Sequence, residues 1–306
     1  GYFLDGPVTK GQDIEELAAY LPLRYEKARK REARRRADLA LAAEDLPVPA
    51  RFRSIPGLLA QAADQFVVNR GNGASIIAGY HWFGEWGRDT FIALPGLLLC
   101  SGRFKEAREI FHRFLDETKY GLVPNVLCEG SCLFNSVDAS LWMVNALRQY
   151  ELYTGDPRFP VSLLPRLKEI ASAYIQGTVY GVKATANGLI EAGAIGSQVT
   201  WMDACVDGVP VTPRQGCPVE VNALWINALE TLGRWSDIAG QGDGHSYRRL
   251  AKTATRSFVT GFRWPEIGLY DGLNGNGPVK EIRPNQVIAA SLTAVRLPLT
   301  VLRDIW

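Results

Sequence analysis

The feature of this sequence that most constrains its fold is a succession of helical patterns joined by loops of very unequal length. After Pro49, eight segments carry apolar residues at helical spacing, and several begin with Pro in the first turn or with a capping Asp or Ser. We expect helices over residues 56–68, 89–101, 104–119, 136–154, 160–178, 218–239, 245–262 and 284–299. No run of alternating β-branched residues is long enough for a central sheet, and residues 177–182 would form a short strand at most.

The connecting loops fall into two groups. Residues 102–103 and 155–159 are short connections, whereas four other loops are long and rich in Gly, Trp, Asn and carboxylates. These long loops are residues 71–88, 121–135, 182–217 and 263–283. Short turns on one rim and long polar loops on the other are typical of an α/α toroid with one active face. The sequence therefore predicts an all-α fold, either a toroid of helical hairpins or a solenoid.

Composition narrows the class of protein. The 306 residues suffice for one large domain or two of ordinary size. Lys and Arg number 34 against 32 Asp and Glu, and a formal net charge of +2 argues against a nucleic-acid partner. The longest apolar run, residues 91–100, is too short to cross a bilayer, so we expect no membrane partner. Nothing in the composition indicates an oligomeric state.

The beginning of the chain differs from the rest. Residues 1–45 are expected to be a connector from an upstream domain, with a charged linker helix. Its segment 26–38 is dense in Arg, Lys and Glu, which favours a solvated helix with i,i+4 ion pairs over a nucleic-acid arm. Pro47 and Pro49 then mark a boundary, and residues 46–306 are expected to form the second domain.

The cysteines and the first ten residues indicate in which cellular compartment the protein acts. Five cysteines form neither a dense nor an even set, which argues against a disulfide scaffold. Cys128 and Cys132 could bind zinc, but three histidines in the whole chain make a poor ligand supply. The first ten residues lack the basic and apolar regions of a signal peptide. We expect a cytoplasmic protein with no metal and no other cofactor.

The segment richest in functional groups is residues 79–90, which contains Trp82, Trp86, Arg88 and Asp89 just before an apolar helix. Asp89 could simply cap that helix, with the Trp residues in the core. A cap, however, requires neither two Trp nor an adjacent Arg. Arg88 and Asp89 together offer donors and acceptors for several hydroxyls of one sugar.

A second segment, Gln198-Val-Thr-Trp-Met-Asp203, lies within the longest loop. A carboxyl group flanked by Trp201 and Met202 loses part of its hydration, which suits a general acid in glycoside cleavage. The alternative is an ordinary loop carboxylate. Asp207, in a Gly-rich turn, is expected to be structural.

Polar residues also begin two predicted helices. Asn135 and Asp138 open one and Glu220 opens another, each followed by a Trp, and each could be a helix cap. The sequence contains no nucleophile elbow, no phosphate-binding glycine loop and no H-E-x-x-H motif. Carboxylates with aromatic residues in long loops therefore favour carbohydrate chemistry.

Residues 78–98 closely resemble the signature of the amylo-α-1,6-glucosidase domain of glycogen debranching enzymes of the bacterial and archaeal type. Six further motifs carry the same resemblance in the same order. They are Gly121-Leu-Val-Pro-Asn125, Asn135-Ser-Val-Asp-Ala-Ser-Leu-Trp142, Thr200-Trp-Met-Asp-Ala204, Thr212-Pro-Arg214, Pro218-Val-Glu-Val-Asn-Ala-Leu-Trp225 and Arg283-Pro-Asn-Gln286.

The resemblance implies an (α/α)6 toroid that releases α-1,6-linked glucose from the branch points of glycogen or limit dextrin. It implies an inverting mechanism in which one carboxyl group protonates the leaving oxygen and another activates water. Asp203 looks like the general acid, and Arg88 and Asp89 resemble the pair that grips the terminal glucose. The remaining residues would line the pocket: Trp82, Trp86 and Trp201 as walls, and Asn135, Asp138 and Glu220 as hydroxyl partners.

This sequence departs from the family pattern at Glu85, where Asp is expected, and at Cys205, where Lys is expected. The second carboxylate and the remaining helices of the toroid are expected beyond Trp306, so the toroid would be incomplete at the C-terminus. Two alternatives stay open. One is another toroidal glycosidase of the glucoamylase or trehalase type, and the other is a non-catalytic glucan-binding domain.

Overall fold

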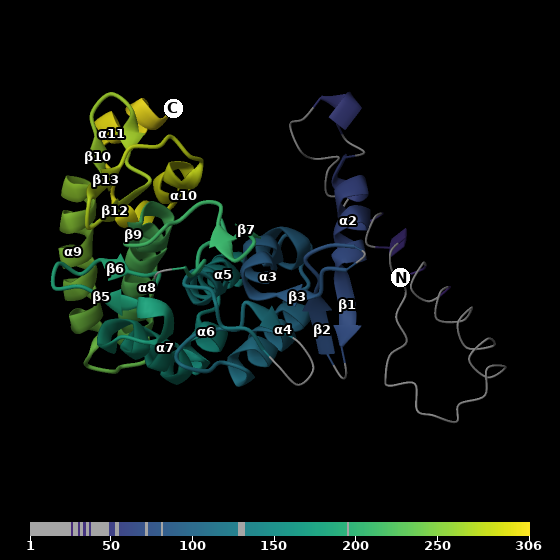
Figure 1. Ribbon diagram of the computed structural model, residues 1–306. Coiled ribbons are helices and arrows are strands. Elements are labelled where there is room, and N and C mark those ends of the chain that lie inside the picture. The colour runs from purple at the N-terminus through teal and green to yellow at the C-terminus, as the bar shows by residue number, and fades with distance from the viewer. Residues whose placement is uncertain are drawn as a thin grey trace. The chain divides into compact units, whose positions relative to one another are not determined.

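The computed structural model (Figure 1) describes residues 49–52, 55–70, 73–80, 82–127, 132–194 and 196–306, and five isolated helical positions between Glu26 and Ala37. The expected boundary near residue 46 and most of the charged helix lie outside the described residues. Lys30 Nζ and Glu26 Oε2 form an i,i+4 ion pair at 3.8 Å. The chain divides into two compact units, unit 1 (Gly1–Arg113) and unit 2 (Phe114–Trp306).

Unit 1 combines short helices with a small hairpin. Its described elements are η1 (Ala50–Phe52), α2 (Ile55–Phe66), β1 (Val67–Arg70), β2 (Gly73–Ile76), β3 (Glu85–Trp86), α3 (Gly87–Leu94), the π-helical turn η2 (Pro95–Leu99) and α4 (Phe104–Asp116), which continues into unit 2. Strands β1 and β2 pair antiparallel, with Val67 opposite Ile76. Buried Arg103 ties α2 to α4, because it donates to Asp64 Oδ1 at 2.8 Å and to Glu106 Oε1 at 2.7 Å.

Unit 2 is mostly helical, with short strands in its loops. Its helices and helical turns are α5 (Ala139–Thr154), α6 (Arg158–Ser162), α7 (Leu164–Gln176), η3 (Val179–Gly181), α8 (Val219–Ile238), α9 (Gly244–Gly261), α10 (Asn285–Ser291), η4 (Thr293–Val295) and α11 (Leu299–Ile305). Its strands are β4 (Val126–Leu127), β5 (Lys183–Ala184), β6 (Ile190–Glu191), β7 (Cys205–Val206), β8 (Val209–Pro210), β9 (Cys217–Pro218), β10 (Arg263–Trp264), β11 (Gly268–Leu269), β12 (Gly272–Asn274) and β13 (Gly277–Val279).

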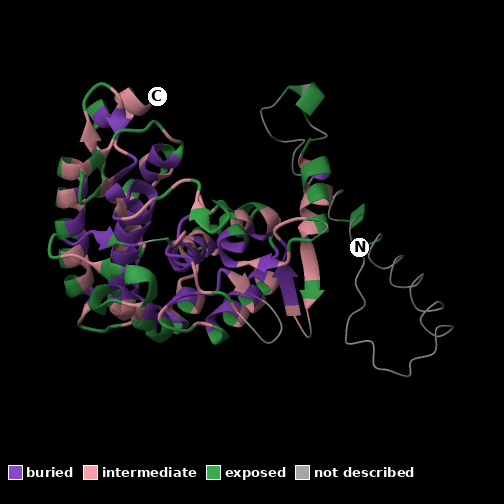
Figure 2. Ribbon diagram, in the orientation of Figure 1, coloured by how far each residue is buried: buried purple, intermediate pink, exposed green. Residues whose placement is uncertain are grey.

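Helix α8 is the centre of unit 2. It packs against α5, α7, α9 and α10, and most of its residues are buried (Figure 2). Trp225 of α8 stacks on Tyr174 of α7 with ring centroids 5.8 Å apart. A neighbouring apolar cluster joins Ile226 of α8 to Phe258 of α9 and Ala289 of α10. Because so many of its side chains are buried against these neighbouring helices, α8 is held in one position, and its N-terminus is held with it.

The eight predicted helical segments all contain helix, and two of them are interrupted at prolines. Residues 177–182, expected to form a short strand at most, contain the helical turn η3. The segment 160–178 is divided into α6 and α7, with Pro165 in the first turn of α7. The segment 284–299 ends early, and Pro298 starts a new helix, α11. Proline lacks an N–H and restricts the residue before it, so an α-helix is interrupted at both places. Among the described residues, strands span two to four residues, so the prediction of no central sheet is confirmed.

The short strands fix the long loops to the helix N-termini. Strands β13, β12 and β9 form a three-stranded sheet, in which Gly272 lies opposite Pro218. Pro218 directly precedes α8, so this sheet holds residues 263–283 against the start of that helix. Asp207 lies at the turn between β7 and β8, as expected of a structural turn residue.

Candidate active site

A buried network of charged side chains lies at the N-terminus of α8. Arg214 donates to both carboxylate oxygens of Glu220, with Nη2 2.7 Å from Oε2. Its Nε and Nη2 also lie 3.1 Å from the two carboxylate oxygens of Asp271. Arg283 Nη1 also donates to Asp271 Oδ2. Bidentate guanidinium–carboxylate pairs are among the strongest polar contacts in proteins, so this network links the long loops 182–217 and 263–283 to the start of α8.

Local structure explains where these residues lie. Glu220 is the second residue of α8, where unpaired backbone N–H groups and the helix dipole favour a carboxylate. Asp271 lies between β11 and β12, and its carbonyl oxygen accepts from the N–H of Val219 at 3.1 Å. The side chains of Arg214, Glu220 and Asp271 are at most 4% exposed. Since breaking a buried ion pair leaves a charge without compensation, the three residues depend on one another.

The electrostatics of the network extend to α5 and α7. Burial raises the pKa of Glu220; hydrogen bonds from Arg214 oppose this rise, and the negative charge of Asp138 adds to it. Burial likewise raises the pKa of the Tyr174 hydroxyl, and Asp138 again contributes. Asp138 therefore lies close enough for its charge to act on Glu220. Both Glu220 oxygens are engaged by Arg214, so this carboxylate is poorly suited to activating a water molecule.

Asp138 occupies the N-cap position of α5, but its side chain makes no capping hydrogen bond. Ser136 takes the capping role instead, because its Oγ accepts from the N–H of Ala139 at 3.1 Å and donates to Asp138 Oδ1 at 2.6 Å. Asp138 is fully buried. The plain N-cap interpretation therefore does not explain why a carboxylate stands at this position.

The predicted acid lies in a loop that the network contacts. Residues 197–204 form neither helix nor strand, and Asp203 is half-buried. The N–H of Val137 donates to the carbonyl of Val199 at 2.8 Å, which joins this loop to the start of α5. Trp201 is 41% exposed, and its indole N–H donates to Asn285 Oδ1 at 2.7 Å. The structure therefore brings Trp201 together with the residues around Glu220 through Asn285.

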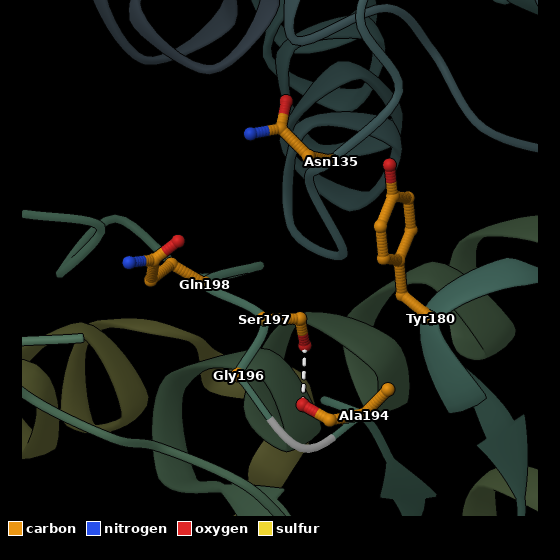
Figure 3. Close-up of a pocket in the computed structure, with 6 residues that line it drawn as sticks. All are labelled: Asn135, Tyr180, Ala194, Gly196, Ser197 and Gln198. Carbon is orange, nitrogen blue, oxygen red and sulfur yellow. Dashed lines mark hydrogen bonds between the residues drawn. The ribbon is translucent and has the colours of Figure 1, made fainter. Parts of the chain in front are cut away.

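An open cavity of about 380 Å³ lies beside the same loop (Figure 3). Asn135 and Tyr180 lie on one side of it, and Ser197 and Gln198 lie across from them. Ala194 and Gly196 also line it. None of the described lining residues is charged, while the amide, phenol and hydroxyl groups can all form hydrogen bonds. Such a lining suits a neutral ligand with many hydroxyl groups.

Gln198, which lines this cavity, and Asn125, which contacts the lining residue Asn135, each have an amide atom with unused hydrogen-bonding capacity. Within the described part of the chain, Gln198 Nε2 is buried without a hydrogen-bond partner. Asn125 is 1% exposed and donates to Asn135 Oδ1 at 3.3 Å, but its own Oδ1 has no partner among the described residues. Buried polar groups are usually satisfied, and exceptions are found where a ligand or water binds.

The predicted residues of unit 1 differ from one another in exposure. Trp82 is 79% exposed, whereas Trp86 is half-buried and directly precedes α3. Phe83 lies between them, with ring centroids 6.1 Å from Trp82 and 6.2 Å from Trp86. Arg88 is buried in the first turn of α3, while Asp89 is exposed there. Consecutive helix residues point in different directions, which accounts for the contrast.

The two departures from the family pattern have different surroundings. Glu85 is buried, accepts from Ser75 Oγ and from Arg113 Nε at 2.9 Å, and lies 3.4 Å from Arg70 Nε. It therefore joins β2, β3 and α4 within unit 1. Cys205 is exposed in β7, two residues after Asp203.

Several residues of this site were not given a role by sequence reasoning. Arg214, Arg283 and Asn285 stand in motifs that carry the family resemblance, but nothing in their spacing indicates that they converge. Asp271 has no sequence signal beyond its place in the long loop 263–283, and it meets its partners only through the sheet around β12. Tyr180 has a φ of +58°, an uncommon value for a non-glycine residue that no sequence pattern indicates.

The described residues contain neither a grouped metal-ligand set nor a membrane-spanning helix. No group of three or more His, Cys, Asp or Glu side chains is arranged to hold a metal ion in that part of the chain. Across the same residues, no helix combines the length and apolar character that crossing a bilayer requires.

Comparison with known proteins identifies the family to which the chain belongs. A family model described as amylo-alpha-1,6-glucosidase matches residues 61–299. The match covers more than half of the chain, so the chain belongs to this family of glycosidases. The glycogen debranching enzyme of Saccharomyces cerevisiae is 28% identical over 223 residues, covering 52% of this chain and 14% of the yeast protein. The chain thus spans about a seventh of that relative's length.

Two solved structures resemble the chain at lower similarity. A rhamnosidase from Klebsiella oxytoca with rhamnose bound has 14% identity and a TM-score of 0.49, covering 66% of this chain and 37% of the other. A GH78 family rhamnosidase of Bacillus sp. GL1 has 15% identity and a TM-score of 0.47, covering 81% of this chain and 22% of the other.

Proposed function

We propose that this protein is a glycoside hydrolase that releases α-1,6-linked glucose from branch points of glycogen or limit dextrin, acting in the cytoplasm. The observation that carries the proposal is the family match over residues 61–299, which includes the segments around Arg88 and Asp203. The uncharged, hydrogen-bonding lining of the cavity beside Gln198 supports a sugar ligand. The toroidal arrangement of helices implied by the family is part of the same proposal.

Asp203 is the general acid in this proposal, and Arg88 and Asp89 bind the terminal glucose. Trp82, Trp86 and Trp201 supply flat apolar faces for sugar rings, and Asn135 supplies an amide. Glu220 and Asp138 are buried, so we assign them a supporting role rather than direct contact with hydroxyls. Glu220 and Asp271 are engaged by Arg214, so neither is assigned as the base that activates water.

The decisive experiment replaces Asp203 with Asn in the full-length protein and follows glucose release from limit dextrin. We expect kcat to fall by roughly 10²- to 10⁴-fold, because the amide cannot protonate the leaving oxygen. Binding of glucose, isomaltose and panose, followed by Trp fluorescence, should persist. Asp207→Asn is the matched control, because this turn residue has a φ of +51°, which Asn also tolerates. Near-normal turnover by Asp203→Asn would show that the acid is misassigned.

A further inference from the structure

A single amide side chain connects the loop of the proposed acid to the buried charge network. Asn285, the first residue of α10, accepts a hydrogen bond from the Trp201 indole N–H at 2.7 Å. Its Nδ2 donates to Asp271 Oδ1 at 2.6 Å and lies 3.8 Å from the sulfur of Met202. Trp201 and Met202 are the two residues that directly precede Asp203. Asn285 therefore contacts both residues next to the acid in sequence.

The chemistry of the partners fixes the orientation of this amide. An indole N–H can only donate, so it requires the oxygen of Asn285; an ionised carboxylate can only accept, so it requires the NH₂ group. A flipped amide would place donor against donor at Trp201 and acceptor against acceptor at Asp271. Asn285 is fully buried, so water cannot compensate for such a mismatch. One orientation satisfies both contacts.

Asp271, to which the Asn285 amide donates, is itself held by several hydrogen bonds. Asp271 receives hydrogen bonds from Arg214 and Arg283, and its own carbonyl accepts from the first N–H of α8. Arg214 is in turn paired with Glu220 of α8. The acid loop itself has no regular secondary structure over residues 197–204, so its geometry depends on contacts of this kind. Functional groups on loops need support from packed neighbours to stay within catalytic tolerance.

We propose that Asn285 is a positioning residue for the general acid, acting through the Trp201 indole and anchored on Asp271. This inference rests on the proposed function, because it takes Asp203 as the acid. Asn285 itself touches neither substrate nor reacting atoms in this proposal. Its effect is to hold the Trp201-Met202-Asp203 segment in one geometry, and a displacement of about 1 Å can cost an enzyme about 100-fold in rate.

The test is a double-mutant cycle in the full-length protein, with glucose release from limit dextrin as the readout. Asn285→Leu removes both hydrogen bonds at similar volume, and Trp201→Phe removes the indole donor. We expect Asn285→Leu alone to lower kcat by about 10- to 100-fold with a smaller change in KM. In the Trp201→Phe background, the same substitution should cost less than about threefold, because the connection is already broken. Asn276→Leu, in the exposed turn between β12 and β13, should leave kcat unchanged.

A second readout does not depend on turnover. Nuclear magnetic resonance of protein labelled with ¹⁵N-tryptophan gives one indole N–H signal for each Trp, and the signal absent in Trp201→Phe belongs to Trp201. The proton shift of this signal should move upfield in Asn285→Leu, because the indole N–H loses its hydrogen bond. The chain has eight Trp, so the other seven signals report whether the variant is folded. If Asn285→Leu does not fold, Asn285→Ser replaces it, because it removes the same contacts without an apolar group beside Asp271, and the same criteria apply.

The outcomes separate this inference from the proposed function. If Asn285→Leu folds and keeps the wild-type kcat, the positioning role alone is overturned. The same holds if Asn285→Leu lowers kcat equally in the wild-type and Trp201→Phe backgrounds. An unchanged Trp201 signal would do the same. A wild-type protein that releases no glucose from limit dextrin would overturn the proposed function, and with it the assignment of Asp203 on which the inference rests.

Discussion

Glu151 shows how a single carboxylate links two helices of the core. It lies on α5, is 4% exposed, and accepts from Arg234 at 2.7 Å and from the Trp235 indole at 2.8 Å, both on α8. Arg148, one turn earlier on α5, lies 2.7 Å away. Burial raises the pKa of Glu151, but these donors and charges outweigh burial and hold the pKa below its usual value of 4.5.

Replacing Glu151 with Gln should lower the free energy of unfolding by about 2 kcal/mol at pH 7, because a buried carboxylate loses its charge-assisted bonds to two Arg side chains and to the buried Trp235 indole. Since the folded-state pKa of Glu151 is lowered, its stabilisation is complete above pH 4.5 and is lost as pH falls through the lowered value. The difference between wild type and variant, measured by urea unfolding, should therefore shrink below pH 4.5. The control is Glu169→Gln, because Glu169 is an exposed ion-pair partner of Arg166. This substitution should change the free energy of unfolding by less than about 1 kcal/mol. A pH-independent difference would contradict this account.

The cysteines differ in predicted reactivity. Burial raises the pKa of the Cys217 thiol to about 11, and the charge of Glu191 contributes, whereas Cys205 is exposed in β7. At pH 8 roughly a thousandth of Cys217 is then thiolate, the reactive form. Mass spectrometry after brief iodoacetamide treatment should find Cys205 alkylated well before Cys217 in the native protein. The difference should disappear in denaturant, and equal native rates would contradict the burial of Cys217.

At the scale of elements, α8 and α9 form an antiparallel hairpin that packs closely because of two glycines. A Cβ added to Gly244, the first residue of α9, would lie 2.7 Å from the carbonyl oxygen of Gly233 on α8. A Cβ on Gly233 would lie 3.0 Å from the carbonyl oxygen of Gly244. Neither position has a positive φ. Glycine is needed here for close approach of the two backbones, not for an unusual conformation.

Gly244→Ala should therefore lower the free energy of unfolding by about 2 kcal/mol, because the methyl group forces the helices apart. Gly242→Ala, two residues earlier, is a matched control: an added Cβ meets nothing within 4 Å, and φ is not positive. The control should be neutral or more stable by up to about 1 kcal/mol, since alanine restricts the unfolded chain. Similar losses in both variants, measured by thermal unfolding, would argue against the close approach.

At the scale of the whole molecule, substrate preference separates the family assignment from a related glycosidase. If the protein is an α-1,6-glucosidase, the full-length enzyme should release glucose from panose and limit dextrin far faster than from maltotriose. An inverting mechanism should give β-glucose as the first product, because attack by water reverses the configuration of the α-linkage. Nuclear magnetic resonance of the fresh product distinguishes the anomers. Preference for maltotriose would instead favour a glucoamylase-like enzyme, and initial α-glucose would contradict inversion.

Much of the helical framework could be predicted from the sequence. The 3.6-residue pattern and the capping residues located the segments that contain α5, α8 and α9, since local periodicity records which face is buried. The helical pattern does not predict the breaks within 160–178 and 284–299, although prolines stand at both, because a proline can either begin a helix or end one. The family resemblance was also available from motifs alone, and the match over residues 61–299 confirms it.

The sequence by itself determined which segments are helical, which loops carry the polar and aromatic residues, and to which family the chain belongs. Only the tertiary structure decided that Arg214, Asp271 and Asn285, separated by 57 and 14 positions along the chain, meet at one helix N-terminus. It also decided that Asp138 and Glu220 are buried while Trp201 is exposed. The physical reason is that burial and ion pairing depend on long-range packing, which local periodicity and motif spacing do not record.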